Sequence, residues 1–150
     1  MTEIREPNFT IDLPGTWQPV SSVEAGAQSY HEVDGEGLLV VLLLAVRPVY
    51  AIADRRRLLD DYLGHRSKYE FGQDPELPYA EPVAVPESDP IEGGWDAANA
   101  EGRRARHRVL LVGNLLADFR VETSGLDESA FDEFADAVLG SAAIVVAQAG

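Results

Sequence analysis

Residues 95–123 read WDAANAEGRRARHRVLLVGNLLADFRVET, and this stretch decides the fold. Two turn signals, Glu101-Gly102 and Gly113-Asn114, divide it into three segments in which apolar and polar residues largely alternate. A period of two is typical of β-strands, because successive side chains point to opposite faces. Glycine reaches positive φ without a Cβ clash, so both turns can be tight. The stretch therefore predicts an antiparallel meander of three strands.

The charge pattern of the last two strands predicts how they pair. A two-residue turn at Gly113-Asn114 would pair Arg108 with Phe119 and mix arginines into the apolar face. A slip of one residue reverses which face every side chain occupies. A three-residue loop over residues 113–115, with a bulge, keeps one face apolar and puts matched charges on the other. We therefore expect the pairs Val109–Phe119, His107–Val121 and Arg106–Glu122.

The remaining elements complete an α+β fold. The run Leu38–Val46 has no charge and is bounded by Gly37 and Arg47-Pro48, so it predicts a central strand covered on both faces. A helix is expected from about Asp54 to Tyr69, and a second one after a cap at Asp127. The apolar stripe of the second helix consists of Phe131, Phe134, Ala135, Val138 and Leu139. Shorter strands are expected at 9–13, 17–20 and 28–33, with a possible edge strand at 81–85 in the proline-rich connection 73–94.

Length and composition limit the class of protein. A chain of 150 residues predicts a single domain over 1–150, with an antiparallel sheet of about six strands and helices on both faces. The chain has no cysteine, which excludes disulfides and thiolate chemistry and favours the cytoplasm. Its net charge of −14 opposes binding to nucleic acid or anionic membranes. Residues 1–7 lack signal-peptide features, and no run approaches the ~20 apolar residues of a membrane helix.

The order of elements resembles the PsbP-like family. The residues that carry the resemblance are FTIDLPGTW at 9–17, followed at the other end of the chain by the meander and the C-terminal helix. The resemblance implies an α/β/α sandwich, as in the extrinsic photosystem II protein, the Ran guanine-nucleotide-release factor and small bacterial proteins. Members of this family differ in function, so the resemblance transfers no site residue to this chain. The lipoprotein members carry a lipobox cysteine, which is absent here.

No pattern of residues predicts catalysis, a cofactor or a metal. His31, His65 and His107 lack a metal-binding spacing, and we expect His107 to be a hydrogen-bonded core residue. The arginine-rich run 103–108 would place three arginines in a row on one strand face, which favours pairing with acids, or a local anion or protein contact, over nucleic-acid binding. The acidic face of the second helix is expected to be solvated rather than to bind calcium; it consists of Glu128, Asp132, Glu133 and Asp136.

Two functions of different classes remain. The first is a non-enzymatic binding or adaptor module that contacts an unidentified protein partner through acidic surface. Within the proline-rich connection, acidic residues surround apolar ones, and the expected contact residues are Leu77, Tyr79, Ile91, Glu81 and Glu87. The other interpretation of this segment is a solvated connector without a binding role. The alternative is a small-molecule-binding protein or enzyme with a pocket between sheet and helix, at His107 and Tyr62.

Overall fold

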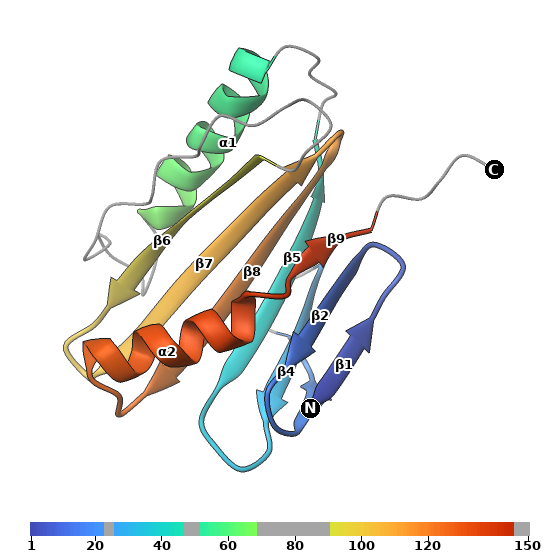
Figure 1. The fold of residues 1–150 in the computed structure, drawn as a ribbon. Helices are drawn as coiled ribbons and strands as arrows, with labels where there is room; N and C mark the ends of the chain where they lie inside the picture. Colours follow the sequence, from blue (N-terminus) through green and yellow to red (C-terminus); the bar gives the residue numbers. More distant parts are fainter. Residues whose placement is uncertain (23–25, 47–51, 69–90, 146–150) are drawn as a thin grey trace.

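The structure, a computed structural model, describes residues 1–22, 26–46, 52–68 and 91–145 (Figure 1). It contains a six-stranded antiparallel sheet in the order β3-β4-β5-β8-β7-β6 and a three-stranded sheet in the order β1-β2-β9. The elements are β1 (Thr2–Arg5), β2 (Phe9–Leu13), β3 (Trp17–Val20), β4 (Ala27–Glu32), β5 (Leu38–Ala45), α1 (Ile52–Ser67), β6 (Ile91–Ala98), β7 (Arg103–Val112), β8 (Leu115–Ser124), α2 (Glu128–Leu139) and β9 (Ala143–Ile144). The predicted α+β class is confirmed.

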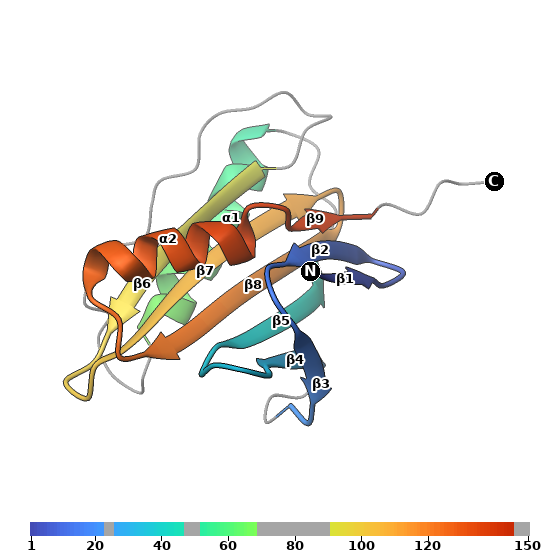
Figure 2. The ribbon, with the colours of Figure 1, turned by 60° about the horizontal axis from the view of Figure 1, so that its bottom comes forward.

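The two helices lie on opposite faces of the large sheet, which confirms the predicted layers (Figure 2). On one face, α2 and the small sheet enclose a core that includes Phe9, Val41, Phe119 and Phe131. On the other face, α1 packs on β6 and neighbouring strands. Its buried core consists of Leu59, Leu63, Ile91, Trp95, Val109, Leu111 and Leu116. The large sheet is therefore the middle layer between two separate apolar cores.

The apolar strand β5 lies third in the large sheet, between β4 and β8. Leu39 and Val41 are fully buried on the face toward α2 and the small sheet. On the opposite face Leu42 is buried, whereas Leu38 and Val40 are half-buried. The strand is thus confirmed at its predicted position, but its two faces are not equally covered.

The predicted register of the β7–β8 hairpin is wrong. The turn is the two-residue Gly113-Asn114, so Arg108 pairs with Phe119 and Arg106 with Val121, not with Glu122. Val109 consequently pairs with Asp118 rather than with Phe119, and His107 with Arg120 rather than with Val121. The prediction assumed that one face of the meander would be wet. Both faces are covered instead, and the charged side chains find partners within the fold.

The small sheet contains two strands that the sequence did not predict. β1 pairs with β2, and β9 adds two residues to the other edge of β2. β6 also begins at Ile91, four residues before the predicted meander. α1 runs from Ile52 to Ser67, close to the predicted 54–69. The expected strand at 81–85 lies outside the described residues.

Asp127 caps α2 as predicted. Its Oδ1 accepts a hydrogen bond of 2.8 Å from the backbone N–H of Ala130, which satisfies a donor that the helix itself leaves free. Phe131, Ala135, Val138 and Leu139 of the predicted stripe are buried, and Phe134 stacks on Trp17 with ring centroids 6.5 Å apart.

We expect Asp127→Ala to lower the free energy of unfolding by about 1 kcal/mol, because the cap bond is lost. Urea denaturation provides the measurement. Glu133→Ala, which removes an exposed acid from the middle of the same helix, should change stability by less than about 0.5 kcal/mol. Equal effects of the two substitutions would contradict a specific capping role.

Candidate functional site

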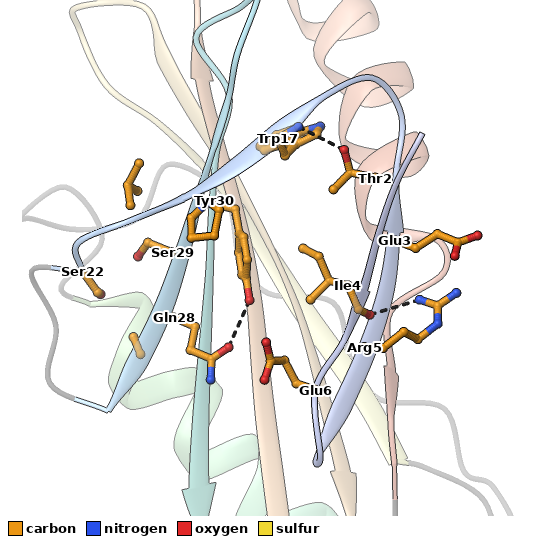
Figure 3. A pocket seen from close by; sticks show the side chains of 13 residues that line it. Thr2, Glu3, Ile4, Arg5, Glu6, Trp17, Ser22, Gln28, Ser29 and Tyr30 are labelled. Atoms are coloured by element: carbon orange, nitrogen blue, oxygen red, sulfur yellow. Dashed lines mark hydrogen bonds between the residues drawn. The ribbon is translucent and has the colours of Figure 1, made fainter.

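A groove of about 570 Å³ lies between the small sheet and the β3–β4 end of the large sheet (Figure 3). β1 and the residue after it form one wall, and β3 and β4 form the other. The residues that line the groove are Thr2, Glu3, Ile4, Arg5, Glu6, Trp17, Pro19, Val20, Ser22, Ala27, Gln28, Ser29 and Tyr30. The groove lies where the small sheet packs over the large sheet, and within the described residues no strand of one sheet pairs with a strand of the other.

Hydrogen bonds of Thr2 and Trp17 close one end of the groove. The hydroxyl of Thr2 accepts a hydrogen bond of 3.0 Å from the backbone N–H of Trp17 and donates one of 2.8 Å to the carbonyl of Gly15. The indole N–H of Trp17 donates to the carbonyl of Pro14 at 2.8 Å. Gly15 has φ 80°, a conformation that favours glycine at this turn. These bonds fix β1 against the start of β3.

Polar side chains gather at the other end. The hydroxyl of Tyr30 donates a hydrogen bond of 3.0 Å to Oε1 of Gln28, and Figure 3 shows the carboxylate of Glu6 directed toward the same place. Burial raises the pKa of Tyr30 above its ordinary value, and the negative charge of Glu6 raises it further. Tyr30 therefore stays protonated, and its hydroxyl oxygen can accept a hydrogen bond from a group in the groove.

The groove combines apolar surface with acid at its rim. Trp17, Ile4 and Tyr30 belong to the buried core and present apolar surface. Glu3 is exposed and Glu6 is half-buried. The single basic side chain in its lining, that of Arg5, forms an ion pair of 2.6 Å with Asp12 on β2. The local charge of the groove is therefore negative.

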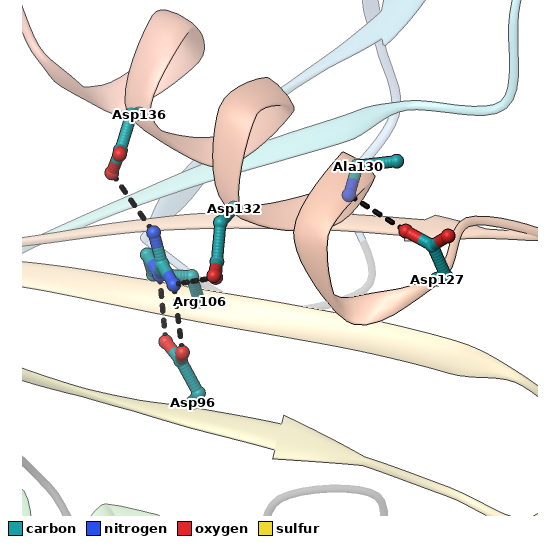
Figure 4. A network of polar contacts seen from close by, with 6 residues as sticks. All are labelled: Asp96, Arg106, Asp127, Ala130, Asp132 and Asp136. Carbon is teal, nitrogen blue, oxygen red and sulfur yellow. Dashed lines mark hydrogen bonds and ion pairs between the residues drawn. The ribbon is translucent and has the colours of Figure 1, made fainter.

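A second polar cluster surrounds Arg106 on the α2 face of the meander (Figure 4). Its guanidinium binds both carboxylate oxygens of Asp96, at 2.7 and 2.8 Å, and also Asp132 at 2.6 Å and Asp136 at 2.9 Å. The hydrogen bond with Asp96 is the largest cause of the raised pKa of Arg106, which stays charged. Its guanidinium carbon also lies 5.7 Å from the ring centroid of Phe131. Arg106 therefore joins β7, β6 and α2.

The predicted pairing of the arginine run with acids is confirmed, although the partners differ from those expected. Arg108 binds Glu92 at 2.9 Å and donates to the carbonyls of Leu139, the last residue of α2, and of Gly140 and Ala142, which follow the helix. Glu122, the partner expected for Arg106, pairs with Arg103 and Arg120. Half of the acidic helix face is thus held in ion pairs, because Asp132 and Asp136 bind Arg106, while Glu128 and Glu133 are exposed. The ion pairs attach α2 to β7, although the side chains of Asp132 and Asp136 are still 50% and 78% exposed.

A third polar cluster lies on the α1 face. Nδ1 of His107 is 2.7 Å from Oδ1 of Asp118, and the hydroxyl of Tyr62 on α1 donates to Oδ2 of Asp118 at 2.6 Å. The ring of His107 stacks on Trp95, with centroids 3.7 Å apart. His107 and Asp118 are buried, which confirms the hydrogen-bonded core histidine. Tyr62 and His107, the pair expected at a pocket, are therefore joined through Asp118.

The charge state of Asp118 is set by these neighbours. Burial alone would raise its pKa, but the charge of His107 and the hydrogen bonds from His107 and Tyr62 outweigh that effect. The pKa of Asp118 consequently lies below its ordinary value. Its carboxylate is therefore ionised inside the protein and binds α1 to the sheet.

The structure tests only part of the predicted contact surface. Ile91 is 1% exposed and packs under α1, so its predicted role as an exposed anchor is wrong. As the first residue of β6 it faces the apolar core, whereas its neighbour Glu92 is exposed. The other four predicted contact residues lie outside the described residues, and they are Leu77, Tyr79, Glu81 and Glu87. His107 and Tyr62 do not line the groove, nor a smaller hollow between β6 and the start of α2, so a ligand at this pair stays a prediction.

The groove could not be found from the sequence. One wall is formed by residues 2–6 and the other by residues between 17 and 30, and β1 was not predicted as a strand. The available signal was the alternation TEIRE at 2–6, which is weak in so short a segment.

The smaller hollow of about 210 Å³ near the start of α2 is lined partly by Asp96 and Asp132, which already bind Arg106.

Comparison with solved structures shows that the chain has a PsbP-like fold. It is similar to the solution structure of cyanobacterial PsbP (CyanoP) from Synechocystis, with a TM-score of 0.70, 14% identity, and coverage of 96% of this chain and 92% of that one. It is also similar to LpqN of Mycobacterium tuberculosis, described as involved in cell envelope biogenesis. For LpqN the TM-score is 0.55 and the identity 12%, with 97% of this chain and 90% of that one covered. A Bacteroides thetaiotaomicron structure matches with a TM-score of 0.54 and 10% identity, covering 92% of this chain and 45% of that one.

No family model and no curated protein matches the chain. At identities of 10–14%, the structural similarities define the fold and leave the function open. Within the described ranges, no helix is long and apolar enough to cross a bilayer. Among the same residues, no group of three or more histidine or acidic side chains is arranged to hold a metal ion.

We expect Asp118→Asn to lower the free energy of unfolding by about 3 kcal/mol at neutral pH, because it removes one partner of a buried charged pair. The unfolded-state pKa of Asp is about 4 and the folded value lies lower, so the carboxylate contributes stability above about pH 4. That contribution is lost as pH falls through the folded pKa.

Urea denaturation of both proteins from neutral to acidic pH measures the effect. The difference between wild type and Asp118→Asn should shrink below about pH 4. Asp61→Asn, at an exposed position on α1, serves as a control and should change stability by less than about 0.5 kcal/mol. A difference that grows on acidification would contradict the assigned charge state.

Proposed function

We propose that this protein is a non-enzymatic binding or adaptor module that contacts a protein partner through the groove between its two sheets. The observation that carries the proposal is the groove itself, with apolar surface inside and Glu3 and Glu6 at the rim. The other polar clusters are occupied, since Arg106 and Asp118 are bound within the fold. The groove therefore offers the most complete combination of space, aromatic surface and charge among the described residues.

The chemistry of the groove fits a protein contact. Tryptophan and tyrosine are enriched at the residues that contribute most to protein interfaces, and here Trp17 and Tyr30 lie in a hollow bordered by polar groups. The chain carries a net charge of −14, which favours encounter with a basic partner. We therefore propose that the partner presents a basic surface. A cytoplasmic location is part of the same proposal, and cell fractionation tests it.

Val20 and Val33 offer a matched pair of substitutions, because each is 42% exposed and only Val20 lines the groove. We expect Val20→Lys to weaken partner binding at least about tenfold, because it places a bulky positive charge in the groove. Val33→Lys adds the same charge outside the groove and should bind like wild type. Both proteins should unfold within about 1 kcal/mol of wild type.

The measurement is affinity capture from native lysate with each protein, followed by binding titration of the captured partner at low and high salt. Added salt should weaken binding, since the proposed contact is electrostatic in part. Equal capture by Val20→Lys and Val33→Lys would remove the groove from the proposed function.

A small-molecule ligand is the second candidate, and the groove volume favours it. About 570 Å³ falls within the range of small-molecule pockets, roughly 300–1,000 Å³. Tyr30 and Gln28 would then orient the ligand through hydrogen bonds. A thermal-shift screen with a metabolite library separates the candidates, because a ligand present well above its Kd raises the melting temperature.

A further inference from the structure

We propose that the groove binds an extended, basic segment of the partner as an added β-strand along the free edge of β1. This inference rests on the proposed function and specifies how that same groove recognises its partner. In strand addition, backbone hydrogen bonds supply affinity and alternate side chains supply specificity.

The hydrogen bonds of β2 show where the backbone of β1 points. Ser141 Oγ accepts a hydrogen bond of 2.7 Å from the backbone N–H of Asp12 and donates one of 3.0 Å to the carbonyl of Asp12. The backbone N–H and C=O of Asp12 therefore point away from β1. The backbone N–H of Val145 donates to the carbonyl of Asn8 at 2.9 Å, so Asn8 and, two residues later, Thr10 point their backbone groups toward β9 and away from β1. In an antiparallel ladder, residues opposite each other point their backbone groups either together or apart. Glu3 and Arg5 lie opposite Asp12 and Thr10 and therefore point their N–H and C=O groups outward from the small sheet.

The lining of the groove agrees with this direction. Five consecutive residues, 2–6, line it. Because alternate side chains of a strand point to opposite faces, five consecutive residues can line one groove only where it runs beside the strand edge. β1 is the terminal strand of its sheet, so its outer edge has no strand partner among the described residues. The four backbone groups of Glu3 and Arg5 therefore border the groove.

The free edge of β3, on the opposite wall, is less able to pair with an added strand. The backbone N–H of Trp17 points out of the large sheet, because it is bound to Thr2. Pro19, two residues later, points its nitrogen the same way and has no N–H to donate. Proline protects edge strands from pairing in this manner. The added strand is therefore expected to pair with β1 and to pack its side chains against β3 and β4.

Charge determines the chemistry of the added strand. Glu3 and Glu6 border the open edge, and the charge of Arg5 is balanced by Asp12 at 2.6 Å. Trp17 and Tyr30 receive apolar side chains from the inner face of the strand. A segment of about four residues with alternating basic and apolar side chains matches both features.

A synthetic octapeptide of alternating lysine and valine is the probe. Titrated into isotope-labelled protein up to millimolar concentration, it should shift the backbone amide signals of Glu3 and Arg5 together with groove residues. The same peptide with alternate backbone nitrogens methylated keeps its charge but loses the donors needed for pairing, so it should bind about tenfold more weakly. A peptide with glutamate in place of lysine should not bind, because the groove is acidic.

Arg5→Pro and Arg5→Ala separate the backbone from the side chain. Both remove the ion pair with Asp12, but only proline removes the outward N–H, and an edge position tolerates it. Arg5→Pro should bind the peptide about tenfold more weakly than Arg5→Ala. Glu6→Gln should weaken binding and reduce its dependence on salt.

The other possible results separate strand addition from a purely electrostatic contact at the groove. Equal binding by Arg5→Pro and Arg5→Ala, with weaker binding by Glu6→Gln, would overturn strand addition and leave the groove as an electrostatic contact. Equal binding of the methylated and unmethylated peptides would overturn strand addition in the same way. Absence of any shift at millimolar peptide would overturn this inference, while the Val20→Lys comparison would still decide the proposed function independently.

Discussion

Coverage of the large sheet on both faces is the constraint on which the rest of the structure depends. Helices cover both faces of β7 and β8, so a charged side chain on either face of these strands needs a partner of opposite charge or a hydrogen-bonding group within the protein. Arg106 finds Asp96, Asp132 and Asp136 under α2, and Asp118 finds His107 and Tyr62 under α1. These contacts attach each helix to the sheet at a defined place, so the charges specify how the layers align as well as satisfying their own hydrogen bonds.

The same constraint explains where a binding site remains. α2 and the small sheet share one face of the large sheet, and hydrogen bonds of Thr2 with Gly15 and Trp17 join the small sheet to the start of β3. Away from that tie the two sheets separate and leave the groove. Its walls end in strand edges, one open at β1 and one blocked by Pro19. Binding surface thus arises where two layers meet incompletely, a common position for ligand sites.

Local patterns predicted elements well and pairings poorly. The cap at Asp127, the apolar stripe of α2 and the strand at Leu38–Ala45 follow from short-range rules, because each depends on a few neighbouring residues. The β7–β8 register failed because the better segregation of charge predicted a bulge, while the actual acidic partners of Arg106 and Arg108 lie on β6 and α2. Ile91 was placed in a loop for a similar reason, since nothing next to it in the sequence indicated that a helix would cover it.

By itself, the sequence determined the α+β class, the two helices, the meander and the net charge of −14, because these depend on periodicity, capping and composition. Only the tertiary structure decided which charges are neutralised and where a partner can bind. The groove requires β1, β3 and β4 to meet, and the open edge of β1 depends on contacts of β2 with Ser141 and Ala143, about 130 residues away. Such long-range contacts are fixed by how the layers pack, which no local pattern of residues encodes.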